Sequence, residues 1–197
     1  MTTKPVVLEK ISARERLLAA AQELFYGEGI NTVGIDRVIE RAGVAKASLY
    51  NAFGSKDELI RAYLLERQEA RKERLAQRLA LHESPREKIL AVFDDMRETA
   101  AKAGFRGCAF VRASAELSGE HSVKSVCDES RQWLSALFAD LARAAGARDP
   151  AALARHLVLL YDGAAVGGQM DAAGGAAQAA REAAAHLMDA SGVSPAI

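Results

Sequence analysis

The sequence predicts an all-α fold of about nine helices. Alanine, leucine, glutamate and arginine are abundant, only four of the 197 residues are proline, and no segment alternates apolar and polar residues with a period of two. Apolar residues instead recur three and four positions apart, which is the spacing of a helix with one buried face. A chain of this length with 50% hydrophobic residues can bury a core in one or two small domains.

Three short helices are predicted in the first part of the chain. The first begins at Ser12 and stops at the glycines of residues 27–29. The second covers Ile35 to Ala42 and ends at Gly43, and the third covers about Ala45 to Ala52.

Longer helices follow from Ser55 onwards. Ser55 and Glu58 have the S-x-x-E spacing of a capping box, in which each side chain bonds to the backbone amide of the other residue. Ser84-Pro85 and Asp149-Pro150 each place a capping side chain before a proline at the first helical position. We therefore divide the chain into an N-terminal domain of residues 1–54 and a C-terminal domain of residues 55–197, with helices expected at 55–79, 84–104, 109–117, 121–145, 150–172 and 176–190.

The composition excludes several classes of protein. Equal numbers of basic and acidic residues, 26 of each, give a formal net charge of zero, so a nucleic-acid or membrane partner would have to be signalled locally. Cys108 and Cys127 are too few for a disulfide framework, and the chain opens without a secretory signal pattern, which indicates a reducing, cytoplasmic setting. The longest near-apolar stretch contains Asp162 and several glycines, and it is too short for a membrane span.

A local signal lies around the third helix. Two short helices joined by a tight turn at Gly43, and preceded by a packing helix, match the helix-turn-helix plan, in which the second helix enters the DNA major groove. On a helical wheel Leu49 faces the apolar side, whereas Tyr50 faces the polar side. Residues 41–56 contain three basic side chains and no acidic one, which suits contact with phosphates.

The segment INTVGIDRVIERAGVAKASLYNAFGSKDELIRAYL, residues 30–64, resembles the TetR family of bacterial transcriptional regulators. The similarity is strongest in Ala42-Gly43-Val44, Leu49-Tyr50, Phe53-Gly54-Ser55-Lys56 and Leu59, which have the spacing of the family. The order of about nine helices extends the resemblance to the whole chain. The resemblance implies that the protein is a homodimeric repressor. Such a repressor leaves a quasi-palindromic DNA operator when a small, mostly apolar ligand binds its C-terminal domain.

The resemblance also assigns candidate DNA contacts on the third helix and just after it. Contacts with backbone phosphates are expected from Lys46, Tyr50 and Lys56, with Ser48 as a helper. Ala47 and Asn51 are expected to face base edges, because alanine can meet a thymine methyl group and asparagine can pair with adenine. A purely structural alternative is that Tyr50 packs on its own domain and that the lysines are only solvated.

Other positions are weaker candidates or depart from the family pattern. Arg37 and Arg41 on the second helix are candidates for DNA contact, although a solvated helix face explains them better. The family usually has Ser or Thr at the positions of Gly34 and Ala45, where a hydroxyl group caps a helix and often touches phosphate. Neither residue can supply that hydroxyl, but the amides at the helix N-termini remain available to an anion.

The C-terminal domain is expected to hold the effector. Its aromatic residues can line an apolar pocket with a few polar groups, as ligand sites commonly do, although core packing is the simpler explanation for each of them. Because the family places its pocket among the central helices, we select Phe110, Trp133 and Tyr161 as lining residues, with His121, Arg112 and Cys108 as polar partners.

A dimer interface is expected around the segment YDGAAVGGQM. Gly163 and Gly167, and likewise Ala164 and Gly168, are four residues apart, so small residues share one side of a helix. Each glycine inside a helix costs about 1 kcal/mol relative to alanine. Close approach of a second helix is one reason to tolerate that cost, and packing within the chain is the alternative. Together with the alanine-rich last helix, the segment resembles the four-helix dimer interface of the family.

Catalytic, cofactor and metal sites are not expected. The sequence has no G-x-S-x-G, G-x-G-x-x-G or P-loop pattern, its four histidines are scattered, and it has no C-x-x-C pair. Two alternatives stay open beside the ligand-responsive repressor. One is a redox-sensing regulator that acts through Cys108 and Cys127, since Arg106 and Arg112 lie near Cys108 in the sequence. The other is a helical module that does not bind DNA.

Overall fold

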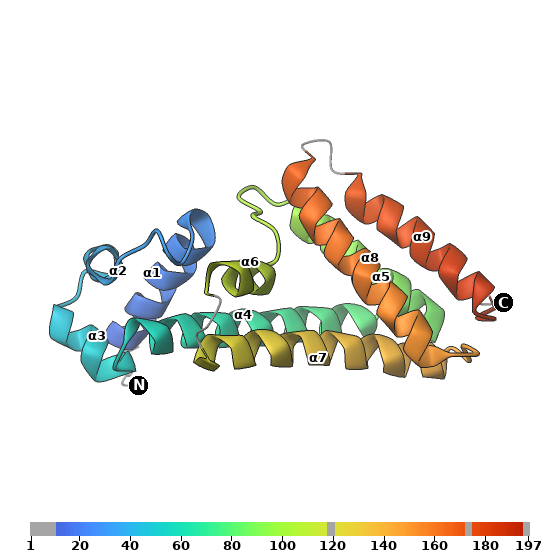
Figure 1. Ribbon diagram of the computed structural model, residues 1–197, viewed down its shortest axis with the longest axis horizontal. Coiled ribbons are helices and arrows are strands. Elements are labelled where there is room, and N and C mark those ends of the chain that lie inside the picture. Colours follow the sequence, from blue (N-terminus) through green and yellow to red (C-terminus); the bar gives the residue numbers. More distant parts are fainter. Residues whose placement is uncertain (1–10, 118–120, 172–174, 195–197) are drawn as a thin grey trace, which may run out of the picture. The chain divides into compact units, whose positions relative to one another are not determined.

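The fold is taken from a computed structural model, which describes residues 11–117, 121–171 and 175–194 of the 197-residue chain, apart from the side chains of residues 121 and 122. Within these ranges the chain forms nine helices and no strand (Figure 1), so the predicted all-α class is confirmed. Its contacts divide it into two compact units, Met1–Tyr63 and Leu64–Ile197. None of the described helices combines the length and the apolar character that a membrane span requires.

Unit 1, Met1–Tyr63, is built from three short helices and the start of a long one. Helix α1 packs against both α2 and α3. The cap of α1 is a reciprocal pair, in which Ser12 Oγ accepts a hydrogen bond from the Glu15 amide and the Glu15 carboxylate accepts one from the Ser12 amide at 2.8 Å. The helices are α1 (Ala13–Glu28), α2 (Ile35–Ala42), α3 (Lys46–Phe53) and the first turns of α4 (Lys56–Leu79).

The core of unit 1 includes residues from the beginning of α4. Tyr63 on α4 meets Phe25 on α1 edge to face, with the two ring centroids 5.7 Å apart, and both side chains are buried. Leu59 and Ile60, also on α4, are buried as well. The compact unit therefore continues to Tyr63, beyond the boundary predicted after residue 54, because the first turns of α4 complete its core.

Unit 2, Leu64–Ile197, contains the rest of α4 and five further helices. Helix α8 packs on α7 and on α9, which lies beside it in Figure 1, and α5 packs on α7, α8 and α9. The rings of Phe93, Phe138 and Tyr161 stack in sequence through the core, with centroid distances of 5.8 and 6.4 Å. The helices are α5 (Pro85–Ala100), α6 (Ala109–Glu116), α7 (His121–Ala144), α8 (Pro150–Met170) and α9 (Ala176–Ala190).

The capping patterns in the sequence mark the true helix starts. Ser55 Oγ accepts from the Glu58 amide at 3.1 Å, and the Asp149 carboxylate accepts from the Ala152 amide at 2.9 Å. One predicted end is wrong, because α5 ends at Ala100 and not at Gly104. Gly104, with φ of 81°, lies in the following turn, where the chain already leads towards α6.

Candidate DNA-binding surface and ligand cavity

Helices α2 and α3 form a helix-turn-helix within unit 1. Gly43 ends α2 in the left-handed conformation, with φ of 62°, which a residue without a side chain adopts at little cost. Arg16 on α1 fastens this turn, because its Nη1 donates to the Gly43 carbonyl at 3.2 Å. Leu49 is fully buried and fixes α3 to the unit. The turn geometry and its anchor together set which side of α3 reaches solvent.

The outward side of α3 carries most of the predicted DNA contacts. Lys46, Ala47 and Asn51 are exposed, and Tyr50 keeps 46% of its surface accessible, so it does not pack into its own domain. Ser48 is half-buried at the border of this face. We call these five residues the α3 face. Its composition offers one cation, one phenol and one amide to a partner.

Lys46 on the α3 face is held by an acidic neighbour. Its Nζ donates to Asp36 Oδ1 of α2 at 2.9 Å, and both side chains are largely exposed. The hydrogen bond with Asp36, and then its negative charge, raise the pKa of Lys46. Lys46 is therefore a cation at any physiological pH, and a phosphate has to replace Asp36 in order to bind it.

The two arginines of α2 are also paired within unit 1. Arg37 Nη2 donates to the Glu28 carboxylate at 2.8 Å, and Arg41 Nη2 lies 2.7 Å from the Glu23 carboxylate. Both pairs connect α2 to α1. Sequence spacing had favoured a solvated helix face for these arginines, and the structure gives them partners that neutralise their charge.

Lys56 has a structural contact that the sequence did not reveal. Its Nζ donates to the Ile30 carbonyl at 2.7 Å and lies 5.9 Å from the centroid of the Phe25 ring, in a partly buried setting. A hydrogen-bonded, cation–π-stabilised lysine of this kind is less available to phosphate than Lys46.

Phe53, the last residue of α3, is half-buried. The Arg14 guanidinium lies 5.0 Å from the centroid of its ring.

The N-termini of α2 and α3 lack side-chain caps, as their residues predicted. Gly34 and Ala45 have the extended conformation of an N-cap residue but make no side-chain cap bond. The first amides of α2 and α3 are therefore open to an anion.

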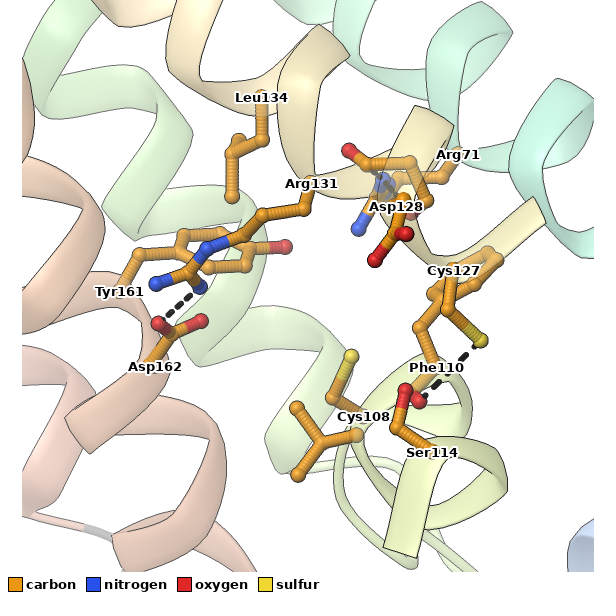
Figure 2. Close-up of a pocket in the computed structure, with 12 residues that line it drawn as sticks. Arg71, Cys108, Phe110, Ser114, Cys127, Asp128, Arg131, Leu134, Tyr161 and Asp162 are labelled. Carbon is orange, nitrogen blue, oxygen red and sulfur yellow. Dashed lines mark hydrogen bonds and ion pairs between the residues drawn. The ribbon is translucent and has the colours of Figure 1, made fainter. Parts of the chain in front are cut away.

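A cavity of about 250 Å³ lies within unit 2, among helices α4, α6, α7 and α8. Figure 2 shows the Tyr161 hydroxyl, the Cys108 sulfur and the Arg71 guanidinium directed towards the same space. Both buried and exposed side chains line it, so the cavity opens to solvent. The lining residues are Arg71, Cys108, Phe110, Val111, Ser114, Cys127, Asp128, Ser130, Arg131, Leu134, Tyr161 and Asp162.

Three of the six residues selected from the sequence line this cavity. They are Phe110, Tyr161 and Cys108. Trp133 does not line it, but its ring lies 5.1 Å from the guanidinium carbon of Arg71. Arg112 is also outside the lining, 4.0 Å from Glu116 on the same helix. The side chain of His121, the sixth candidate, lies outside the described part of the structure.

Arg71 is a buried cation in the cavity wall, and it was not among the residues selected from the sequence. Only 8% of its surface is accessible to solvent. Arg74 and Arg78, on the same helix α4, are more exposed. The Phe110 ring centroid lies 4.9 Å from its guanidinium carbon, and its Nη2 donates to Ser130 Oγ at 2.8 Å. The available signal was that Arg71 falls on the same side of α4 as Gln68 and Leu75, which are also buried.

The two cysteines differ in setting. Cys127 is buried, its thiol donates to the Phe110 carbonyl at 3.6 Å, and burial raises the pKa of this thiol. A raised pKa leaves less of the reactive thiolate at neutral pH, so Cys127 is a poor redox centre. Cys108 is half-buried and faces the cavity (Figure 2), where it serves as a small apolar wall group.

The small residues of α8 pack mainly within the chain. A Cβ at Gly167 would lie 2.5 Å from the Ala176 side chain, one at Gly168 would lie 3.0 Å from the Ala100 side chain, and Ala164 is buried. Close packing inside unit 2 therefore accounts for these three. Gly163 differs, because it is exposed and nothing lies within 4 Å of the position of its missing Cβ.

The family assignment rests on similarity that spans the chain. A family model described as "Bacterial regulatory proteins, tetR family" matches residues 17–63, which cover the helix-turn-helix. The crystal structure of SCO4454, a TetR-family transcriptional regulator from Streptomyces coelicolor, is 34% identical over 93% of this chain and 96% of that chain, with a TM-score of 0.82. The chain belongs to the TetR family.

Two characterised relatives of this TetR-family chain regulate in opposite directions. The transcriptional activator FasR of Mycolicibacterium smegmatis is 44% identical over 57 residues, 29% of this chain and 26% of FasR. The transcriptional repressor NemR of Escherichia coli is 32% identical over 126 residues, 63% of this chain and 59% of NemR. The matched segments thus span about a quarter of one relative and three-fifths of the other.

Membership of the TetR family settles the class of the protein. It is a DNA-binding transcriptional regulator with a helix-turn-helix, and it is not an enzyme. The assignment does not favour a helical module without DNA binding. Nor does it favour a redox sensor, for which the pKa of Cys127 is shifted in the unhelpful direction.

Proposed function

We propose that this TetR-family protein is a homodimeric repressor that leaves a quasi-palindromic operator when a small, mostly apolar ligand enters the cavity of unit 2. The observation that carries the proposal is the path of α4. This single helix of 24 residues begins at the Ser55 cap in unit 1 and places Arg71 in the cavity wall of unit 2. A ligand that moves α4 would therefore also move unit 1, which holds the recognition helix α3.

The α3 face is the proposed reading surface. Lys46 and Tyr50 contact backbone phosphates, with Ser48 in support, and Ala47 and Asn51 face base edges in the major groove. Lys56, Arg37 and Arg41 have the secondary role of holding α2 and α3 in place, since each is bonded to another part of unit 1. The proposed phosphate contacts are therefore Lys46 and Tyr50, without Lys56.

The proposed dimer forms through an apolar stripe on α8, which we call the α8 stripe. It consists of Leu159, Gly163, Val166 and Met170, all exposed and spaced so that they share one side of the helix. Leu159 and Met170 expose 64% and 77% of their surfaces, which is unfavourable in water unless a partner covers them. Gly163 would let the partner helix approach closely.

Dimer symmetry then defines the operator. A two-fold axis relates two copies of the α3 face, so the DNA should contain two half-sites in inverted orientation, about one helical turn or a multiple apart. Release follows as a coupling free energy: the ligand binds more tightly to a dimer geometry in which the two α3 faces no longer fit successive major grooves.

Selection of bound sequences from random double-stranded DNA by the purified protein tests this proposal. We expect recovery of one inverted repeat, and binding of one dimer to each repeat. A reporter gene behind that repeat, in cells with and without the protein, then shows the direction of regulation. Recovery of a single asymmetric site would contradict the dimer, and higher reporter expression with the protein would contradict repression.

A further inference from the structure

Arg71 is a buried cation that has no anionic partner among the described residues. Of its three side-chain nitrogens only Nη2 has hydrogen-bond partners among the described residues, namely Ser130 Oγ at 2.8 Å and the Ser130 carbonyl at 3.4 Å. Its Nε is buried and has no partner there. The rings of Phe110 and Trp133, 4.9 and 5.1 Å away, stabilise the charge but do not neutralise it. A charge in this setting is costly unless an anion joins it.

The carboxylates near the cavity are already engaged by other cations. Each of them has another lysine or arginine within ion-pair distance, and none of them lies within ion-pair distance of Arg71. The pairs are Asp95 with Arg74 at 2.7 Å, Asp128 with Lys124 at 2.5 Å, and Asp162 with Arg131, the last drawn in Figure 2. The lining holds two cations, Arg71 and Arg131, and two carboxylates, Asp128 and Asp162, and of the two cations only Arg71 has no carboxylate of the described residues within ion-pair distance.

The remaining wall is apolar or neutral. Phe110 and Leu134 are buried and face the cavity, and Cys108 adds a polarizable sulfur. Burial raises the pKa of Tyr161 to about 12, so its phenol stays protonated. The Tyr161 hydroxyl makes no hydrogen bond to a described residue and points into the cavity (Figure 2), where it can donate to an acceptor.

From this arrangement we infer that the ligand is a small organic acid, whose single carboxylate pairs with Arg71 and whose compact apolar body lies against Phe110, Leu134 and Tyr161. This inference rests on the proposed function, because it names the chemical class of the effector. A planar guanidinium matches a carboxylate in shape as well as in charge. The Tyr161 hydroxyl is a neutral hydrogen-bond donor for the same carboxylate.

Charge and size narrow the class further. A phosphate dianion would bring two negative charges to one unpaired cation, with Asp128 and Asp162 in the same wall. The cavity of about 250 Å³ exceeds the roughly 150 Å³ that accepts a benzene molecule, so it can hold a ligand of that size. One aromatic ring or a branched chain of similar volume, with one carboxylate, fits both limits.

The test compares acids with their neutral amides on the wild-type protein. Titration calorimetry of the purified 197-residue protein with benzoate, phenylacetate and isovalerate should show one site per chain for at least one acid. The corresponding amide, which keeps shape and loses charge, should bind at least about tenfold more weakly, as expected for the loss of one charge-assisted pair. Equal affinity for an acid and its amide, or no binding by any of the three acids, overturns the inference.

Two arginine variants locate the charge. Arg71→Gln should weaken binding of the acid at least about tenfold and abolish its preference over the amide. Arg143→Gln is the control, because Arg143 is ion-paired with Asp140 and does not line the cavity. This control should change acid binding by less than about threefold. An Arg71→Gln protein that still prefers the acid to the amide would contradict the assignment of Arg71.

Operator release is measured separately, so that the two proposals can fail independently. If the acid binds through Arg71 but leaves operator affinity unchanged, the ligand class stands and the release mechanism fails. If neutral apolar amides release the operator and acids do not, the release mechanism stands and the ligand class fails.

Discussion

In the free protein, the Lys46 ammonium group binds the Asp36 carboxylate. In the proposed DNA complex, a backbone phosphate takes the place of this carboxylate. The Nζ to Oδ1 distance is 2.9 Å, and both groups are exposed, so exchange of one anion for another needs no rearrangement of the fold. An exposed ion pair of this kind contributes little to stability. Its effect belongs to the binding step, where Asp36 competes with the DNA backbone.

Replacing Lys46 with alanine should weaken DNA binding by a similar factor for all sequences. The plot of log affinity against log salt concentration should lose about one unit of slope, because one phosphate contact disappears. Fluorescence anisotropy with operator and scrambled DNA at several salt concentrations measures both effects. Lys72→Ala is the control, since Lys72 is ion-paired with Glu69 outside the α3 face. An unchanged slope in Lys46→Ala would count against the phosphate contact.

Replacing Asp36 with asparagine should have the opposite effect. Lys46 would lose its competitor but keep its charge, so affinity for both operator and scrambled DNA should rise severalfold. Asp140→Asn makes the same change of charge at an exposed ion pair in unit 2, and it should leave the affinity unchanged. Competition between labelled and unlabelled DNA at low salt would show the difference in DNA affinity between the two variants most clearly. Equal increases in both variants would indicate a general charge effect rather than release of Lys46.

The position of a residue was predictable where a local pattern or the family resemblance determines it. The exposure of Tyr50 could be predicted from its place on a helical wheel, and the resemblance to the TetR family selected Phe110 and Tyr161, which line the cavity. Arg71 and Lys56 could not be interpreted in this way. Their partners, Ser130 and the Ile30 carbonyl, are 59 and 26 residues away in the chain, so only the folded structure brings them together.

At the scale of the element, α3 is a helix that begins without help from its N-cap residue. Ala45 has φ of −72° and ψ of 150°, the conformation of a capping residue, yet it offers no side-chain acceptor. Its anchor is the buried Leu49, and Gly43 sets the entry angle. The recognition helix therefore depends on packing and on the preceding turn.

A hydroxyl at this cap should stabilise α3. Ala45→Ser supplies the missing acceptor in a conformation that already suits it, worth about 1 kcal/mol. Hydrogen–deuterium exchange of the amides in residues 46–53 should slow by about fivefold. Gly34→Ser, at the cap of α2, is the matched control and should have a smaller effect, a few tenths of a kcal/mol. Faster exchange in Ala45→Ser would show that the added side chain disturbs the turn.

The starts of four helices were predictable because each of these starts has a capping side chain. Serine or aspartate caps, followed by proline or glutamate, mark α1, α4, α5 and α8 in the sequence and in the structure. The extent of the units was less accessible. The contact of Tyr63 with Phe25 joins positions 38 residues apart, so the sequence alone did not show that the first turns of α4 complete unit 1.

At the scale of the whole molecule, the proposed assembly depends on the α8 stripe. Gly167 and Gly168 are explained by packing within one chain, so the spacing of small residues does not by itself indicate a dimer interface at these positions. What remains for a partner is the exposed set Leu159, Gly163, Val166 and Met170. Exposure is a property of the folded chain, and the spacing of small residues could not separate the two roles.

Placing a charge on the α8 stripe should separate the protomers. Val166→Glu would bury an unpaired carboxylate near the two-fold axis, and the dissociation constant of the dimer should rise at least about a hundredfold. Sedimentation velocity over a range of protein concentrations measures this constant. Leu81→Glu adds the same charge at a residue that is 81% exposed outside the stripe, and it should leave the dimer intact. A Val166→Glu protein that associates like the wild type would exclude this face.

The paired cations of unit 1 also bear on how many copies of the regulator a cell needs. Arg37, Arg41 and Lys46 each have a carboxylate partner, so these three cations attract DNA of arbitrary sequence less than unpaired cations would. A genome presents about a million or more such competing sites, and every copy bound to them is lost to the operator. Weak retention by bulk DNA leaves more copies in solution, so a small number of molecules can keep one operator occupied.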